Sequence, residues 1–421
     1  MVNILLNDWP GWLALILSFI IIIKSQRLWK DKHLTYALCF IISMHHLTAL
    51  INTYFFTFRG ADADAARFNR LAAVWATNGK LAFSIGPGLY QQLLGIFYRI
   101  FTPSHLFGEE LSILVFLFSC LVLIKLLQLI DLEKYRISII LVYGLLPANL
   151  VICSVTLRES YQMLFFMLSV YYGIKYRFSP HIRYFMLCIF SALLMALFHK
   201  ALILYAFFLL ILFFLWTLKK NPEDKTKKSI FTRKGFIFAG VIFLIILGTM
   251  IISDLFDIKG FEVIRSVFSG ETLQYAARYR EKLLYVWGSG ARANYGIMLN
   301  TSSVGAFIKS GSLIYFYYLF APFPWQITNW LDVYAFLESL LRLIFIIFSV
   351  NFYYHAKGYQ RDIAGLLLII YFSMTLLWAI GTMNYGTSIR HHLLTNWIIF
   401  VLGGSVLLEL INQQYKKYFK E

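Results

Sequence analysis

The chain has 421 residues, of which 60% are hydrophobic and only 14% are charged, and its mean hydropathy is +0.69. A soluble globular domain carries about a quarter charged residues, so this composition excludes an ordinary soluble protein. The net charge of +17 would suggest a nucleic-acid partner in a soluble chain. In a membrane protein the same excess arises from basic cytoplasmic loops, so we expect no nucleic-acid partner.

Apolar runs long enough to cross a bilayer, about 18 to 20 residues each, recur along the whole chain. We therefore predict an all-α, polytopic integral membrane protein with about 11 transmembrane helices, which form a single membrane domain over residues 1–421. The predicted spans are 11–23, 34–57, 110–130, 136–155, 160–175, 184–199, 201–218, 235–253, 335–354, 363–382 and 393–411.

Basic clusters alternate with these spans and predict an orientation. The clusters on one side are 24–32, 134–136, 175–183, 219–234, 357–361 and 416–420. Because Lys and Arg accumulate in cytoplasmic loops, we expect the N-terminus on the outer side of the membrane and the C-terminus in the cytoplasm. Loop 219–234 is then short, basic and cytoplasmic, and residues 58–109 and 254–334 form long outer loops.

The outer loops contain predicted amphipathic helices. Residues Arg67–Trp75 and Leu89–Phe101 each place apolar side chains on one helical face, with a turn at Gly86-Pro87-Gly88 between them. We expect both helices to lie on the outer leaflet of the membrane. The aromatic-rich stretch Tyr315–Trp330, which contains Pro322-Phe323-Pro324-Trp325, is predicted to form a re-entrant or interfacial hairpin.

Two aspartates follow the second predicted span, at Asp62 and Asp64. Carboxylates two residues apart can share a divalent cation, or one of them can act as a general base. Alternatively, they cap the helix that follows, because a carboxylate is favoured at a helix N-terminus. Apart from a divalent cation at this pair, we expect no metal and no cofactor.

Short outer connections carry further charged residues. Arg158 and Glu159 lie in a tight corner between two spans, where a charge pair is costly unless it pairs internally or faces a wet cavity. The pair either stabilises the corner or binds a phosphate oxygen through Arg158, with Glu159 orienting the guanidinium. At the next corner, His199 is a structural or a catalytic residue, and Lys200 is a candidate phosphate contact.

The last outer corner, residues 384–392, combines small polar residues with Arg390 and His391. The large outer loop mixes arginines with aromatic rings, which suits phosphate pairing and sugar stacking but is also typical of a solvated loop. Together, the outer corners are predicted to build one polar chamber. The candidate phosphate-binding residues are Arg158, Lys200, Arg278, Arg280 and Arg390, and the candidate glycan-binding residues are Tyr275, Tyr279, Trp287 and His391.

Two classes of protein other than enzymes are also considered. A transporter is expected to place ionisable groups near the middle of its spans, with broken helices around them. The mid-span polar residues His45, His46 and Asn149, which lies beside Pro147, are explained by helix packing and a kink. The charges cluster at one face instead, which favours surface chemistry over passage. A structural subunit of an envelope complex is the third possibility.

The run Arg59–Asp64, together with the two amphipathic helices that follow it, resembles the first outer loop of GT-C-type glycosyltransferases. These multi-spanning enzymes take sugars from polyprenyl-linked donors. The corner Leu157–Ser160, the segment Pro322–Trp325 and the stretch Asn384–Arg390 are similar to those of bacterial envelope-polysaccharide membrane proteins. That wider group includes the Wzy-type O-antigen and capsule polymerases.

This resemblance implies a bacterial cell inner membrane, in which the outer loops and the N-terminus are periplasmic and the C-terminus is cytoplasmic, and an inverting glycosyl transfer on the periplasmic face. Asp62 or Asp64 would be the catalytic base, Glu159 and His199 would assist, and the candidate cations would hold the departing pyrophosphate. The span number and the large late outer loop resemble a Wzy-type polymerase, which joins undecaprenyl-pyrophosphate-linked repeat units, more closely than an enzyme that adds a single sugar from a polyprenyl-phosphate donor. A lipid-linked glycan transporter is the alternative from another class.

The expected partners follow from the same resemblance. They are an undecaprenyl-linked oligosaccharide and membrane lipid, together with a chain-length regulator and a flippase of polysaccharide biosynthesis, either for lipopolysaccharide or for capsule.

Overall fold

The computed structural model describes residues 7–58, 62–82, 84–218, 272–283, 285 and 293–419. Within these ranges the chain is helical, as predicted, and the sole β-pairing is an antiparallel bridge between Asn294 and Asn384. The α-helices are α2 Trp9–Trp29, α3 Lys32–Tyr54, α4 Asp62–Asn78, α5 Pro87–Ile100, α6 His105–Leu129, α7 Arg136–Leu145, α8 Pro147–Ile152, α9 Glu159–Phe178, α10 Ile182–Leu197, α11 Lys200–Leu218, α14 Thr272–Leu283, α15 Val304–Phe320, α16 Trp330–His355, α17 Gly358–Gly381 and α18 Tyr385–Phe419.

Seven helices in the described part of the chain are long and apolar enough to cross a membrane. They lie in α2, α3, α6, α11, α16, α17 and α18, and each matches a predicted span. A multi-pass membrane protein is therefore supported, but the predicted count of about 11 spans is wrong for the described residues. The predicted span 235–253 and the loop 219–234 lie outside the described residues, as does most of 254–292.

Three predicted spans do not form a long apolar helix. Residues 136–155 are broken before Pro147 into α7, with 10 residues, and α8, with 6 residues, because proline cannot continue the helical hydrogen bonding. Helix α10 has only 16 residues, fewer than the roughly 20 that a bilayer needs. Helix α9 has 20 residues but is too rich in tyrosine and other polar side chains.

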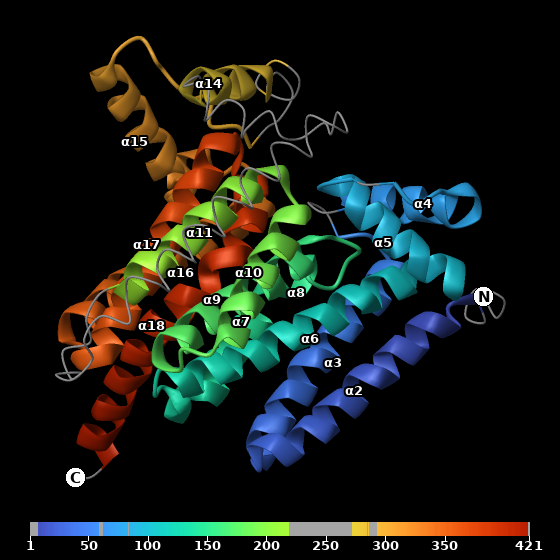
Figure 1. Cartoon of the computed structure of the whole chain (residues 1–421), viewed down its shortest axis with the longest axis horizontal. Coiled ribbons are helices and arrows are strands. Elements are labelled where there is room, and N and C mark those ends of the chain that lie inside the picture. Colours follow the sequence, from blue (N-terminus) through green and yellow to red (C-terminus); the bar gives the residue numbers. More distant parts are fainter. Residues whose placement is uncertain are drawn as a thin grey trace.

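The two amphipathic segments after the second span are helical, as predicted. Helix α4 begins at Asp62 and α5 begins at Pro87, directly after the predicted turn. Both helices lie on the same side of the molecule as α14, whereas the C-terminus and the turn between α2 and α3 lie on the opposite side (Figure 1). We refer to the first of these sides as the α4 side. The predicted hairpin Tyr315–Trp330 consists of the end of α15, a 3-10 turn at Pro324–Gln326 and the first residue of α16.

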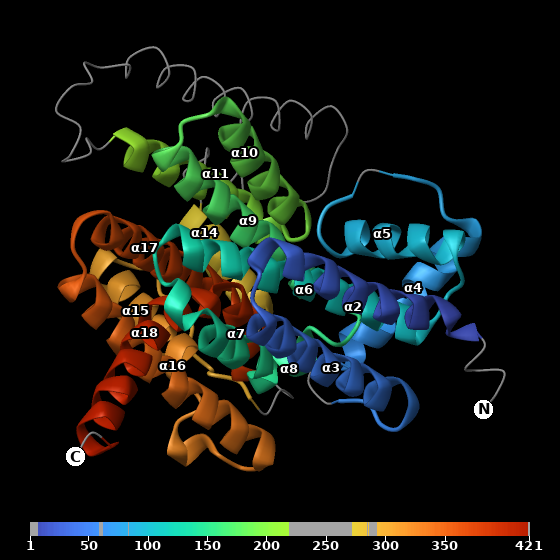
Figure 2. The same cartoon turned by 90° about the horizontal axis from the view of Figure 1, so that it is seen from below.

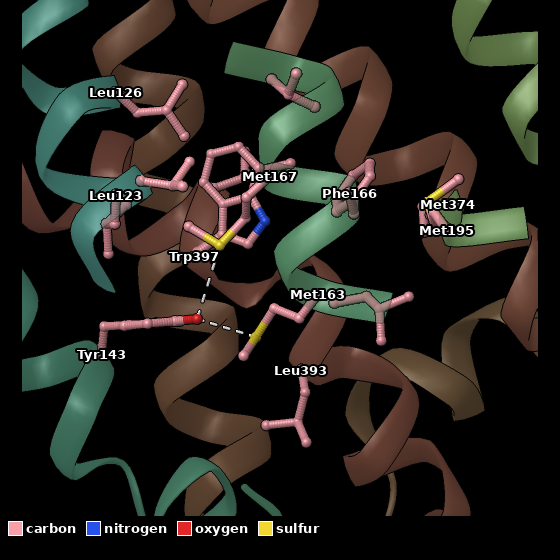
Figure 3. Packing of buried hydrophobic residues seen from close by; sticks show 14 of the residues in the cluster. Leu123, Leu126, Tyr143, Met163, Phe166, Met167, Met195, Met374, Leu393 and Trp397 are labelled. Atoms are coloured by element: carbon pink, nitrogen blue, oxygen red, sulfur yellow. Dashed lines mark hydrogen bonds between the residues drawn. The ribbon is translucent and has the colours of Figure 1, made fainter. Parts of the chain in front are cut away.

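The long helices form three groups, and the short helix α7 packs against α3, α6 and α18. Figure 2 shows α2, α3 and α6 together, with α9, α10 and α11 on one flank and α15 to α18 on another. The core between α6, α9 and α18 is apolar and tightly filled, with Trp397 fully buried beside Phe166 (Figure 3). The hydroxyl of Tyr143 donates to the sulfur of Met163 at 2.9 Å, so its polar atom is satisfied inside this core.

Helices α16 and α18 approach each other closely at Gly403. A Cβ atom there would lie 2.4 Å from the carbonyl oxygen of Phe345, whereas a Cβ at the adjacent Gly404 would meet only side-chain atoms, at 3.7 Å. We expect Gly403→Ala to destabilise the protein by about 1–3 kcal/mol because the two backbones must separate. Gly404→Ala is the matched control and should have little effect. Thermal unfolding in detergent micelles measures both, and equal unfolding temperatures for the two variants would contradict the close approach.

Candidate functional site

Helix ends from distant parts of the chain meet on the α4 side. Helix α4 contributes Asp64, the start of α9 contributes Glu159, and the start of α18 contributes Arg390. Arg390 Nη1 donates to Asp64 Oδ2 at 2.6 Å, and its Nη2 and Nε donate to Glu159 Oε1 at 2.5 and 3.1 Å. Arg390 therefore joins two carboxylates that come from separate predicted corners of the sequence.

These three side chains differ in exposure. The side chain of Glu159 is 6% exposed and that of Arg390 is 14% exposed, whereas that of Asp64 is 47% exposed. Burial raises the pKa of Glu159, but the guanidinium charges of Arg390 and Arg158 outweigh it and hold that pKa below its ordinary value. Glu159 is thus an ionised anchor for Arg390, and Asp64 is the carboxylate that faces solvent.

Arg158 lies beside this ion pair, and only some of its N–H groups donate hydrogen bonds within the protein. Its Nη1 donates to the carbonyl oxygen of Phe198 at 3.1 Å, while its buried Nε has no hydrogen-bond partner. Glu159 Oε2 and Ser160 Oγ are also buried without a partner. Burial lowers the pKa of Arg158, yet an arginine stays charged at neutral pH. A buried cation with an unpaired N–H group is suited to bind an anion.

Gly86 brings the start of α5 against this corner. Its backbone has φ of +75°, a conformation that favours glycine, and its N–H donates to the carbonyl oxygen of Leu197 at 2.7 Å. A Cβ at Gly86 would lie 3.5 Å from Arg158 Nη1. The predicted turn between the two amphipathic helices is therefore part of the wall around Arg158.

Two histidines pack on Trp378 at the end of α17. The ring of His391 stacks on Trp378 with centroids 3.9 Å apart, and the ring of His199 meets it edge-on at 4.7 Å. Burial and the neighbouring cations hold the pKa of His199 well below its ordinary value, so its imidazole is neutral. The N–H of Ala201 donates to His199 Nδ1 at 3.2 Å, so Nε2 carries the ring proton. In this form His199 Nε2 can donate a hydrogen bond but cannot accept a proton.

The candidate binding residues on α14 differ in burial. Arg280 is fully buried, with its Nε donating to Ile297 and its Nη1 to three carbonyl groups at the end of α17, those of Ala379, Ile380 and Thr382. It thereby caps α17 and attaches α14 to it. Tyr275 and Tyr279 stack on each other with centroids 6.5 Å apart, and Arg278 is exposed.

The structure thus brings Asp64, Arg158, Glu159, His199, Arg390 and His391 together, with Lys200 half-buried at the start of α11. The side chain of Arg280 instead points into the protein, where it binds backbone carbonyl groups. Trp287 and the side chain of Asp62 lie outside the described residues, so the divalent cation at Asp62 and Asp64 stays a prediction. Among the described residues no three His, Cys, Asp or Glu side chains are arranged to hold a metal ion.

Sequence reasoning missed Trp378, on which both histidines pack, and treated Gly86 as a turn residue alone. The available signal for Trp378 is its position at the outer end of the predicted span 363–382, level with the last outer corner. Comparison of the chain with protein-family models, with curated proteins and with solved structures found no match.

The environment of Glu159 predicts an acid-sensitive contribution to stability. Because its pKa is lower in the folded protein than the ordinary value of 4.5, the contribution is fully present above pH 4.5 and is lost as the pH falls through the lowered value. We expect the thermal unfolding temperature in detergent to drop in this acid range, and to drop less for Glu159→Gln. An identical acid profile for both proteins would contradict the pairing with Arg390.

Proposed function

We propose that the protein is a membrane glycosyltransferase that uses a polyprenyl-linked sugar donor, and that it polymerises undecaprenyl-pyrophosphate-linked repeat units of O-antigen or capsule. One observation carries the proposal: a buried arginine with an unpaired N–H group lies next to an arginine that holds a half-exposed carboxylate. This combination supplies an anion site and a candidate base within one cluster, which are the two groups that glycosyl transfer from a pyrophosphate requires.

Arg158 and Arg390 are assigned to the departing pyrophosphate. Negative charge grows on this group as its bond to the anomeric carbon breaks, and preorganised cations away from bulk water stabilise that charge. The unpaired Nε of Arg158 provides a donor that the protein itself does not use. The neutral His199, through its Nε2–H, is a further donor toward a phosphate or a sugar oxygen.

Asp64 is assigned as the base. Only its Oδ2 atom pairs with Arg390, and its side chain is 47% exposed, so its second oxygen can receive a proton. The acceptor hydroxyl would lose its proton to Asp64 as its oxygen bonds to the anomeric carbon, and the pyrophosphate would leave with the electron pair of the broken bond. Asp62, two residues earlier at the start of α4, remains the alternative base.

The distribution of charge supports an orientation with this site on the periplasmic face. The basic loops between α2 and α3 and between α9 and α10 lie on the side of the molecule opposite the α4 side. This is where cytoplasmic loops are then expected. With this orientation a polyprenyl chain would stay in the bilayer beside the bundle while its pyrophosphate reaches the α4 side.

The experiment that tests the proposal is complementation in the native host. The gene is deleted and restored as wild type, as Asp64→Asn, or as Glu409→Gln, a control carboxylate that pairs with Lys134 on the opposite side of the molecule. Surface polysaccharide is then resolved by chain length on a gel. A lipid anchor capped with one repeat unit in the deletion and Asp64→Asn strains supports the polymerase.

The other outcomes of this experiment are also informative. A truncated repeat unit indicates the alternative enzyme, which adds a single sugar from a polyprenyl-phosphate donor. Repeat units that accumulate on the cytoplasmic side indicate a lipid-linked glycan transporter. Unchanged polysaccharide in the deletion strain contradicts all three functions.

A further inference from the structure

Helix α16 carries two ionisable residues within its membrane-spanning part. Glu338 and Arg342 are one helical turn apart, and both are buried. The expectation that the charges cluster at one face of the membrane therefore does not hold for this helix. Charged side chains inside a span are costly, and they usually mark ion or proton sites.

Glu338 and Arg342 line a small cavity between α16 and α18 that has no room for a water molecule. Its other lining residues are Asn396 and Phe400 on α18, Leu341 on α16, and Leu146. Leu146 lies at the break between α7 and α8, so the cavity adjoins an interrupted helix. Breaks of this kind accompany ion sites in membrane proteins because the interruption leaves polar backbone groups inside the bundle.

The polar groups around this cavity lack partners. Neither carboxyl oxygen of Glu338 accepts a hydrogen bond, and Arg342 Nε and Asn396 Oδ1 have no partner either. Arg342 is turned away, since its Nη1 donates to the carbonyl oxygen of Leu319 at 2.6 Å, near the end of α15. Glu338 and Arg342 do not form an ion pair within 4.0 Å, although their spacing on the helix would allow one.

Few titratable residues surround Glu338 and Arg342. Those that interact with Glu338 are Arg342 and Tyr334, both on its own helix; the hydroxyl of Tyr334 lies near the carboxyl group but makes no hydrogen bond of ordinary geometry to it. Those that interact with Arg342 from the helices and the segment around it are Tyr295, Tyr318, Tyr371 and His392. No second carboxylate is among these neighbours, so Glu338 is the acidic group of this cluster.

An ionised carboxylate without donors is among the costliest groups to bury, whereas a protonated carboxyl group needs only one acceptor. Asn396 Oδ1, on the far wall of the cavity, is an unused acceptor. We propose that Glu338 is a proton-binding site within the membrane domain and that it holds a proton in the conformation described here. This inference is independent of the proposed glycosyl transfer.

Loss of the proton would change the partner of Arg342. When the O–H bond of Glu338 breaks and the proton leaves for bulk solvent outside the protein, the remaining carboxylate attracts the guanidinium of Arg342 one turn away. Arg342 then leaves the carbonyl oxygen of Leu319, and α15 loses that contact near its C-terminal end. The protonation state of Glu338 would thus control how α15 is held against α16.

The test is infrared spectroscopy of the full-length protein in detergent, compared with Glu338→Gln. The spectrum of the wild type minus that of the variant should contain the C=O stretch of one protonated carboxyl group at neutral pH. A difference in the carboxylate stretching region instead would overturn the proposal. Glu110→Gln is the control for band assignment, because Glu110 is also buried but its Oε2 lies 2.6 Å from His46 Nδ1.

Two further variants keep the test decisive. If Glu338→Gln does not fold, Glu338→Asp should shift the frequency of the same band, and an unshifted band would overturn the assignment. In Arg342→Met the carboxylate has lost its alternative partner, so the band should persist to a pH about one unit higher than in the wild type. An unchanged midpoint would overturn the exchange of partners by Arg342.

Discussion

Replacing Arg390 with methionine is expected to abolish polymer formation and to destabilise the protein by about 3–5 kcal/mol. The change removes a cation proposed to hold the leaving group, and it leaves the buried carboxylate of Glu159 without its main partner. Asp64 loses its only described hydrogen-bond donor at the same time. Gel analysis of surface polysaccharide measures the first effect, and thermal unfolding of the purified protein in detergent measures the second.

A double variant separates these two effects. In Arg390→Met with Glu159→Gln, a neutral amide replaces the buried carboxylate that lost its partner, so most of the lost stability should return while the polymer remains absent. Recovery of polymer in the double variant would show that Arg390 acts only by neutralising Glu159. Wild-type polymer in Arg390→Met alone would contradict the assignment of Arg390 to the leaving group.

The membrane helices were predicted best where a single property decides the structure. Length and hydropathy alone identify a span such as Gly358–Gly381, because an apolar run of that length has few alternatives. The stretch 136–155 is equally apolar, but Pro147 divides it into two short helices whose direction depends on packing. Hydropathy carries no information on that packing, so the number of spans was overestimated.

The sequence predicted which inter-helix corners contribute residues to the candidate site, but it did not predict which side chains form ion pairs there. The spans predict outer positions for Asp64, Glu159 and Arg390, and the structure brings these three side chains together. Which carboxylate pairs with Arg390 depends on how helices far apart in the sequence pack, which residue spacing cannot reveal. Arg280 illustrates the same limit, because an arginine that caps buried carbonyl groups has the same sequence context as one that faces a ligand.

Glu338 was accessible to sequence reasoning and was overlooked. It lies within the predicted span 335–354, where an acidic residue is unusual on composition alone. Its lack of hydrogen-bond partners and its position at the α7–α8 break could be learned only from the structure. An intramembrane acid of this kind is also the feature expected of a transporter, so the spectroscopic test and the polysaccharide gel address separate properties of the chain.

Replacing Arg158 with methionine should also abolish polymer formation, with a loss of at least about 100-fold in activity, but it should leave stability within about 1 kcal/mol of the wild type. Arg158 makes a single described hydrogen bond, to the carbonyl oxygen of Phe198, and its burial as a cation is itself unfavourable. Glu159 keeps its partner Arg390 in this variant. The folded protein therefore loses little, whereas the departing pyrophosphate loses the donor at Nε.

The contrast between the two arginine variants decides between a binding site and a structural ion-pair cluster. If the cluster only holds helix ends together, Arg158→Met should retain polymer of wild-type chain length, since it breaks no ion pair within 4.0 Å. If the cluster binds a pyrophosphate, this variant should be folded and inactive, whereas Arg390→Met is destabilised as well as inactive. Arg70→Met, which removes an exposed arginine from α4 on the same side of the molecule, controls for the general loss of positive charge near the site.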